Sequence, residues 1–274
     1  TYPMNIGAHI PSKNAMEEIK LRKGDTFQIF ISSPQMWKSP KPREDVDILQ
    51  EYDGPIYVHA PYLINVATPN NKVRHPSRKL LKDTCKVAAS FGAKGVIVHG
   101  GSVGEGGDIS VGYDNWRKAL EHVEETGMRV LVENTAGGKN SVARYMDSIE
   151  RLWEVIGHLN VGLCLDTCHT WAGGITTIDA VKGFKKLVKK ADIIVENFRF
   201  GVTQRLGIDY EHLKSINPTI IYCSITGYGT TGPAANKKAF DATVQAAAGL
   251  MSVTGDPKGP SMKIGSSMGD TIAG

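Results

Sequence analysis

Side chains that can bind a metal ion follow several short apolar runs in the first two thirds of the chain. Five of them stand at or just after the ends of four such runs: His59, His99, Glu133, Asp166 and His169. Imidazole and carboxylate together suit zinc, or manganese where oxygen ligands dominate. One histidine after a strand is usually a satisfied core residue, but four strand ends in succession are hard to explain in that way. The pattern therefore predicts a metal site.

The elements that must position these side chains alternate regularly. Six β-branched runs are expected to be strands: 4–10, 26–31, 56–62, 95–99, 130–134 and 161–166. Helix-like stretches lie between them, most clearly at 77–91, 114–125 and 142–156. Runs that are apolar at nearly every position are typical of strands buried on both faces. Six strand–helix units favour a (β/α) barrel, in which all strand C-termini open on one face, so the five side chains can converge.

The last hundred residues continue the alternation with a different composition. A lysine-rich helix is expected over 180–190, and its lysines are typical of a solvated helix face. Strands are expected at 192–198 and 219–226, with a helix over 210–215 between them. By periodicity alone these strands could be the seventh and eighth of a closed barrel. They could equally belong to a separate α/β unit.

Charge is distributed unevenly along the 274 residues. The net charge is +4, with 41% hydrophobic and 22% charged residues, which is ordinary for a globular protein and excludes wholesale disorder. Residues 1–174 carry 20 basic and 20 acidic side chains, whereas 175–274 carry 12 and 8. The whole cationic excess therefore lies in the last hundred residues, and it is no argument for nucleic-acid binding by the first part.

Four cysteines do not make a disulfide framework, so a reducing, cytoplasmic compartment is expected. Cys164 and Cys168 lack a matching second pair, which argues against a zinc ribbon. The apolar runs are far shorter than a membrane span, and the N-terminal residues show no secretory signal, so no membrane partner is expected. The first residue is Thr1 and the last is Gly274, which is compatible with a fragment at either end.

Several motifs between about residues 4 and 174 resemble those of endonuclease IV. They are Ile-Gly-Ala-His at 6–9, His-Ala-Pro-Tyr-Leu-Ile-Asn at 59–65, Val-His-Gly-Gly at 98–101, Glu-Asn-Thr-Ala-Gly at 133–137 and Cys-Leu-Asp-Thr-Cys-His at 164–169. The resemblance implies a TIM barrel with up to three zinc ions that nicks double-stranded DNA 5′ to abasic sites. Clustered zinc ions in such a site activate water and neutralise developing charge.

The resemblance also assigns roles to residues. His59, His99 and Glu133 would hold the first zinc ion, and Glu133, which would be central to catalysis, would bridge to the second. Asp166 would bind the second ion and His169 the third. Tyr62 would lie beside the flipped-out abasic nucleotide, and Gln35 stands where many members carry a wedging arginine. His9 is also expected to contact DNA.

The match weakens after His169. The family needs two more histidines, an aspartate and a glutamate from its last two strands, and the only later histidine, His212, stands in an unrelated context. Glu196 would be the only new residue of ligand type at a strand end. We therefore expect one or two zinc ions at most and impaired activity.

Residues from about 178 to 274 resemble class III CoA transferases instead. The motifs that carry this resemblance are Val-Glu-Asn-Phe-Arg at 195–199, Arg-Leu-Gly at 205–207, Ile-Asn-Pro at 216–218, Ile-Tyr-Cys-Ser-Ile-Thr-Gly at 221–227, Thr-Gly-Pro at 231–233, Phe-Asp at 240–241, Gly-Leu-Met-Ser at 249–252 and Met-Gly-Asp at 268–270. The resemblance implies a Rossmann-like α/β unit in which Asp270 attacks an acyl-CoA thioester, a form of covalent catalysis. It also implies four CoA-contacting residues: Asn197, Phe198, Arg205 and Lys238. Phe240 stands where related racemases carry a histidine, which favours the transferase branch.

The chain is thus interpreted as a chimera of two partial enzymes, with an endonuclease IV-like barrel of about six units at 1–174 and a CoA-transferase-like part at 175–274. The later part is expected to supply the remaining strands. Three hypotheses follow: a zinc-dependent abasic-site endonuclease, an acyl-CoA transferase, or a hybrid without activity. A metal-dependent sugar isomerase on a similar barrel is a fourth, which the motifs fit less well. The oligomeric state is not predicted.

Overall fold

Eight parallel strands form one continuous sheet in the computed structural model of the chain. The structure describes residues 5, 7–174, 185, 188–189, 191–198, 200–237, 239–256 and 259–264. The strands are β1 (Gly7–His9), β2 (Thr26–Ile29), β3 (Ile56–His59), β4 (Gly95–His99), β5 (Val130–Glu133), β6 (Val161–Asp166), β7 (Ile193–Glu196) and β8 (Ile221–Ser224). Each pairs in parallel with the next, in the order β1 to β8.

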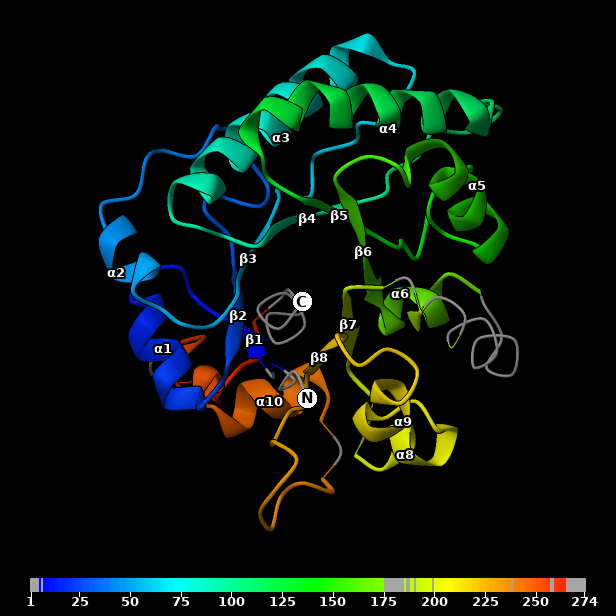
Figure 1. The fold of residues 1–274 in the computed structure, drawn as a ribbon. Coiled ribbons are helices and arrows are strands. Elements are labelled where there is room, and N and C mark those ends of the chain that lie inside the picture. The colour runs from blue at the N-terminus through cyan, green and yellow to red at the C-terminus, as the bar shows by residue number, and fades with distance from the viewer. Residues whose placement is uncertain are drawn as a thin grey trace.

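Helices connect the strands and surround the sheet (Figure 1). The longer ones are α1 (Ala15–Arg22), α3 (Asn71–Ser90), α4 (Ile109–Val123) and α5 (Met146–Ile156). The shorter ones are α2 (Val46–Gln50), η1 (Glu124–Thr126), α6 (Thr167–Ala172), α8 (Val202–Leu206), α9 (Tyr210–Lys214), α10 (Asp241–Ala247) and η2 (Leu250–Val253). None of the helices in the described part of the chain is both long and apolar enough to cross a bilayer. The expected helix 180–190 lies mostly outside the described residues.

The strands β7 and β8 take the seventh and eighth places of the barrel, as one of the two sequence-based alternatives predicted. Leu165 of β6 pairs with Ile194 of β7, which pairs in turn with Tyr222 of β8. β8 lies beside β1, and the thiol of Cys223 donates a hydrogen bond to the carbonyl of Gly7 at 3.4 Å. Figure 1, which looks along the barrel, shows β8 and β1 as neighbours on the lower side of the ring of strands. The last two strands therefore bring the ends of the sheet together.

Two packed regions hold the barrel. The larger one lies between the strands and the helices, and contains buried residues from both parts of the chain, including Trp116 of α4 and Ile194 of β7. The smaller one fills the bottom of the barrel interior with Ile97, Leu131, Cys164 and Ile193. Alternation along each strand directs every second side chain inward. Three polar residues stand two positions after interior residues and therefore also point into the barrel: His99, Glu133 and Asp166.

Candidate metal centre

Four strand ends and the start of one helix carry the five predicted ligands. His59 ends β3, His99 ends β4, Glu133 ends β5 and Asp166 ends β6, while His169 lies in the first turn of α6. Because all strands run in the same direction, these side chains meet at the C-terminal mouth of the barrel. Their ligand atoms form two groups that share Glu133, one with His59 and His99 and the other with Asp166 and His169.

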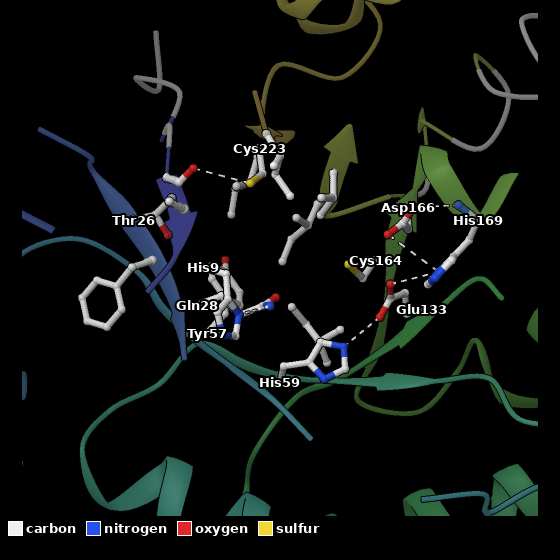
Figure 2. A pocket seen from close by; sticks show the side chains of 18 of the residues that line it. His9, Thr26, Gln28, Tyr57, His59, Glu133, Cys164, Asp166, His169 and Cys223 are labelled. Atoms are coloured by element: carbon white, nitrogen blue, oxygen red, sulfur yellow. Dashed lines mark hydrogen bonds and ion pairs between the residues drawn. The ribbon is translucent and has the colours of Figure 1, made fainter. Parts of the chain in front are cut away.

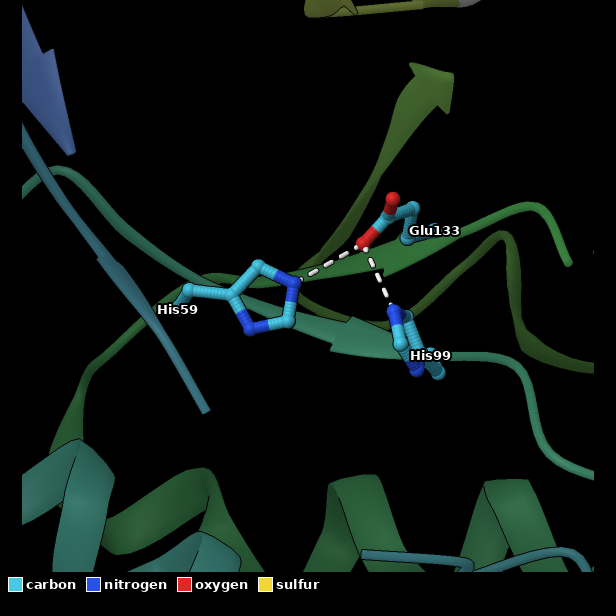
Figure 3. A group of neighbouring side chains, drawn as sticks. All are labelled: His59, His99 and Glu133. Atoms are coloured by element: carbon cyan, nitrogen blue, oxygen red, sulfur yellow. Dashed lines mark hydrogen bonds and ion pairs between the residues drawn. The ribbon is translucent and has the colours of Figure 1, made fainter. Parts of the chain in front are cut away.

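The first group surrounds one carboxylate oxygen of Glu133 (Figure 3). His59 Nε2 lies 3.0 Å from Glu133 Oε2, and His99 Nε2 lies 3.4 Å from the same oxygen. His59 and Glu133 are buried, at 6% and 5% exposure. Two imidazole nitrogens and a carboxylate oxygen are the donor set of many zinc sites.

The hydrogen bonds of His59 provide a test of whether this set fits a cation. Its Nδ1 lies 2.7 Å from the carbonyl oxygen of Ala60, which can only accept, so Nδ1 carries the proton. In the neutral ring Nε2 then directs a lone pair at the Glu133 carboxylate. A proton or a metal ion must lie between them, and a backbone carbonyl at the opposite nitrogen is the usual second partner of a zinc-bound histidine. The residues therefore fit zinc.

The second group is organised by Asn134. Its side-chain amide donates to the Asp166 carbonyl at 2.9 Å and to Thr170 Oγ1 at 3.2 Å, and its Oδ1 accepts from Asp166 N at 2.6 Å. Its own carbonyl accepts from His169 Nδ1 at 2.8 Å. His169 Nδ1 also lies 3.2 Å from Glu133 Oε1, so Nε2 is the ring nitrogen that remains for a metal ion. Asn134 thus ties the end of β5 to the end of β6 and to α6.

Burial and mutual charge perturb the ionisation of these groups. Burial, with the charge of Glu133, raises the pKa of Asp166 to about 6, and burial lowers the pKa of His99 to about 4. Burial opposes ionisation of Glu133 too, but hydrogen bonds from His169 and His59 hold its pKa well below the usual range. Burial acts to lower the pKa of His169, yet the bond to Glu133 and the charge of Asp166 raise it to about 9. Two carboxylates crowded in this way favour a bound cation.

A cavity of about 330 Å³ extends from this mouth into the barrel (Figure 2). His9 lines it and accepts a hydrogen bond from Gln28 through Nδ1 at 2.8 Å. Tyr62 also lines it and stacks on His99, with ring centroids 5.4 Å apart and planes at 12°. Gln35 is exposed on a loop whose Pro34 carbonyl accepts from Tyr62 N at 2.9 Å. The three residues expected to contact DNA thus lie at or near one cavity.

The last two strands contribute different chemistry. Asp166 pairs with Val195 of β7, and Val195 pairs with Cys223 of β8, and both of these side chains line the cavity. Glu196 is the next residue after Val195, so it points away from the cavity, and its Oε2 accepts from Phe198 N at 2.8 Å. Among the described residues, β7 and β8 place no histidine or carboxylate in the cavity wall. Glu196 therefore does not replace a missing ligand.

The residues expected to contact CoA are only partly described. Asn197 follows β7 and is exposed, Phe198 is half-buried beside it, and Arg205 is exposed on α8. Lys238 and the expected nucleophile Asp270 lie outside the described residues. The structure therefore leaves a CoA site as a prediction.

Several cavity residues were not identified from the sequence as belonging to the site, among them Gln28, Tyr57 and Cys164. Tyr57 and Cys164 stand two positions before His59 and Asp166, so the two-residue period of a strand could have identified them as interior residues. Asn134 was seen within a motif, but its role depends on partners in β6 and α6. Such contacts between distant segments leave no periodic signal.

Comparison with known proteins agrees with this architecture. A family model described as "Xylose isomerase-like TIM barrel" matches residues 22–214, and one described as "CoA-transferase family III" matches residues 175–274. The chain therefore belongs to the family of xylose isomerase-like TIM barrels that includes endonuclease IV.

Individual relatives point in the same direction. The chain is 50% identical over 191 residues to a "Probable endonuclease 4" of Mycobacterium bovis (strain BCG / Pasteur 1173P2). The aligned region covers 70% of this chain and 75% of that protein. Among solved structures, endonuclease IV from Thermus thermophilus is similar at 25% identity and a TM-score of 0.62, covering 85% of this chain and 94% of that one. A D-tagatose 3-epimerase-like protein shares the fold, with 19% identity and a TM-score of 0.62. That match covers 81% of this chain and 90% of the other chain.

Proposed function

We propose that the chain is a zinc-dependent endonuclease that hydrolyses double-stranded DNA 5′ to abasic sites, with activity well below that of a complete family member. The observation that carries the proposal is the convergence of His59, His99 and Glu133 at the barrel mouth. The 50% identity to a protein named endonuclease 4 supports the same activity. The proposal includes the cytoplasmic compartment that the sparse cysteines predict.

The residues at the mouth would bind and orient the substrate. His59, His99 and Glu133 would hold one zinc ion, and Asp166 with His169 would hold part of a second. When bound, zinc supplies Lewis acidity and a nucleophilic hydroxide at neutral pH. Glu133 contacts His59 of the first ligand group and His169 of the second, and would hold the two imidazole rings in position. Burial raises the pKa of Tyr62, so its hydroxyl stays protonated beside the site.

The expected impairment follows from the last two strands. Val195 and Cys223 occupy the level of the barrel at which Asp166 lies. An apolar valine offers no ligand, and burial raises the pKa of the Cys223 thiol to about 12, which disfavours the thiolate that binds zinc. A site with fewer cations neutralises less of the charge that develops on the phosphate. We therefore expect one or two zinc ions and slow hydrolysis.

A nicking assay on a duplex with a single abasic site tests this function. We expect slow zinc-stimulated nicking by the full chain that is lost in His99→Ala. His158→Ala is the matched control and should behave as the unmodified protein, because His158 is exposed in the turn between α5 and β6. Absence of nicking at any zinc concentration, or equal nicking by His99→Ala, contradicts the proposal.

The alternative is acyl-CoA transfer, which the family match at 175–274 favours. Asp270 would then attack the thioester, with Asn197, Phe198, Arg205 and Lys238 binding CoA. Since β7 and β8 are built into the barrel, a Rossmann-like sheet would require them to leave it. Hydroxylamine trapping after incubation with acetyl-CoA distinguishes the two, and we expect no adduct at Asp270. An adduct lost in Asp270→Asn would establish the transferase instead.

The division at residue 174 and the chimeric origin are part of the proposal as well. The two family matches overlap between residues 175 and 214, and the sheet continues across the division. Transcript sequencing across codons 170–180 tests the fusion directly. A hybrid without activity is the outcome if both assays fail.

A further inference from the structure

The cavity of the barrel has two chemically different sides. One side carries the predicted ligands on β3 to β6, with two carboxylates and three imidazoles at the mouth. Another side comes from β7, β8 and the residue that follows β8, which line the cavity with four aliphatic side chains: Ile193, Val195, Ile221 and Ile225. This contrast is a property of the particular strands that close this barrel.

The aliphatic side is held in place by regular structure. Ile193 pairs with Ile221 across the β7–β8 ladder, and Ile225 N donates to the Glu196 carbonyl at 2.7 Å. Val195 faces Asp166 in the β6–β7 ladder. The aliphatic side therefore begins with Ile225 on the mouth side, passes Val195 at the level of Asp166, and continues to Ile193 and Ile221 toward the bottom of the barrel.

The cavity is exposed to solvent at the ligand end and enclosed at the other. The side chains of His99 and His169 are 26% and 27% exposed, whereas Ile97 and Cys164 deeper inside are 1% exposed. Figure 2 shows Cys223 and Cys164 facing the same hollow as Glu133 and Asp166. A molecule that enters must lead with its apolar end and leave its polar end at the mouth.

We propose that this cavity binds a small amphiphilic chelator, with a monoanionic oxygen head at the zinc site and a short aliphatic tail against β7 and β8. This inference rests on the proposed zinc centre. The volume of about 330 Å³ lies at the lower end for small-molecule pockets, which are mostly apolar with a few convergent polar groups. One zinc ion balanced by Glu133 and Asp166 leaves little net charge, which favours a singly charged head over a polyanion.

A series of straight-chain hydroxamates, from acetohydroxamate to hexanohydroxamate, tests the proposal on the zinc-loaded full chain. Isothermal titration calorimetry measures the dissociation constant, and mass spectrometry of the same sample measures bound zinc. Each methylene that enters the aliphatic region should tighten binding about fourfold. The gain should end when the tail reaches the enclosed end of the cavity.

Val195→Thr tests the location of the tail, because it places a hydroxyl in the aliphatic side with little change in volume. We expect it to weaken hexanohydroxamate about fivefold and to weaken acetohydroxamate, which has a single methyl group, clearly less. Val253→Thr, at a position 80% exposed in η2, is the matched control and should change neither.

The outcomes separate this inference from the proposed function. Bound zinc with equal affinity for all tail lengths overturns the amphiphilic site and leaves the zinc centre standing. A chain-length gain that is unchanged in Val195→Thr overturns the assignment of the tail to β7 and β8. Absence of bound zinc overturns both proposals.

Discussion

Replacing Ile194 by alanine tests whether the last two strands complete the barrel. Ile194 is fully buried in the main core and pairs with Leu165 of β6 and Tyr222 of β8. Removal of a buried isoleucine side chain costs about 2–5 kcal/mol, because apolar contacts are lost and a cavity remains. If β7 belongs to the barrel, this loss destabilises the whole barrel.

Tryptophan fluorescence can report on the first part of the chain alone. All four tryptophans precede residue 174, at positions 37, 116, 153 and 171. With a urea m-value of about 3 kcal/mol per molar, a loss of about 3 kcal/mol shifts the fluorescence midpoint down by about 1 M. Ile194→Val should shift it by half of that or less, and the exposed Val253→Ala should not shift it.

The result that refutes this reasoning is specific. If Ile194→Ala leaves the fluorescence midpoint unchanged while circular dichroism reveals a separate, earlier transition, the later residues unfold on their own. The barrel would then not depend on β7.

Three further predictions concern individual contacts. Asn134→Ala should weaken zinc binding about 10- to 100-fold in a competition titration, because the Asn134 side chain bonds to the Asp166 backbone and to Thr170 Oγ1. The bond from His169 to the backbone carbonyl of residue 134 remains in this variant, and unchanged affinity would show that the side-chain bonds are dispensable. Glu196→Gln should retain the zinc content of the unmodified protein while Glu133→Gln loses zinc, because Glu196 faces away from the cavity; equal losses would place Glu196 at the metal. Gly7→Ala should lower stability by about 1–3 kcal/mol in thermal melts, because a Cβ there would lie 2.1 Å from the Thr26 carbonyl oxygen, and an unchanged melting temperature would contradict the close approach of β1 and β2.

The strand bounds were predicted best where an apolar run ends at a predicted metal ligand. The expected ranges 95–99 and 161–166 match β4 and β6 residue for residue. The expected strand 56–62 is shorter in the structure, because Pro61 has no backbone N–H to pair and β3 ends at His59. The helix expected from residue 77 begins at Asn71, with Pro76 inside it and Asn70 as its cap. The side chain of Asn70 accepts a hydrogen bond from Lys72 N, so the helix begins at this cap and continues through Pro76.

The closure of the barrel could not be decided from periodicity. The runs containing Ile194 and Tyr222 are mostly apolar, as they would be in a barrel or in a Rossmann-like sheet. Only the ladders to β6 and the contact with β1 distinguish the two. The orientation of Glu196 is a second such case, because a shift of one residue along a strand reverses the face on which a side chain lies.

In the site, too, the residues at strand ends could be predicted from the sequence, whereas contacts between distant segments could not. His59, His99, Glu133 and Asp166 were identifiable because each stands at a strand end, and parallel strands bring their ends together. The hydrogen bonds of Asn134 and the aliphatic side formed by Val195 depend on which strands become neighbours. Those neighbours come from parts of the chain that resemble different families.

Anomalous diffraction at the zinc absorption edge tests the central claim most directly, on crystals of the full chain grown with zinc. We predict a strong peak bounded by His59 Nε2, His99 Nε2 and Glu133, and at most one more beside Asp166 and His169. The first peak should vanish in His99→Ala and persist in His158→Ala. A structure with zinc bound elsewhere and none among His59, His99 and Glu133 would contradict the account.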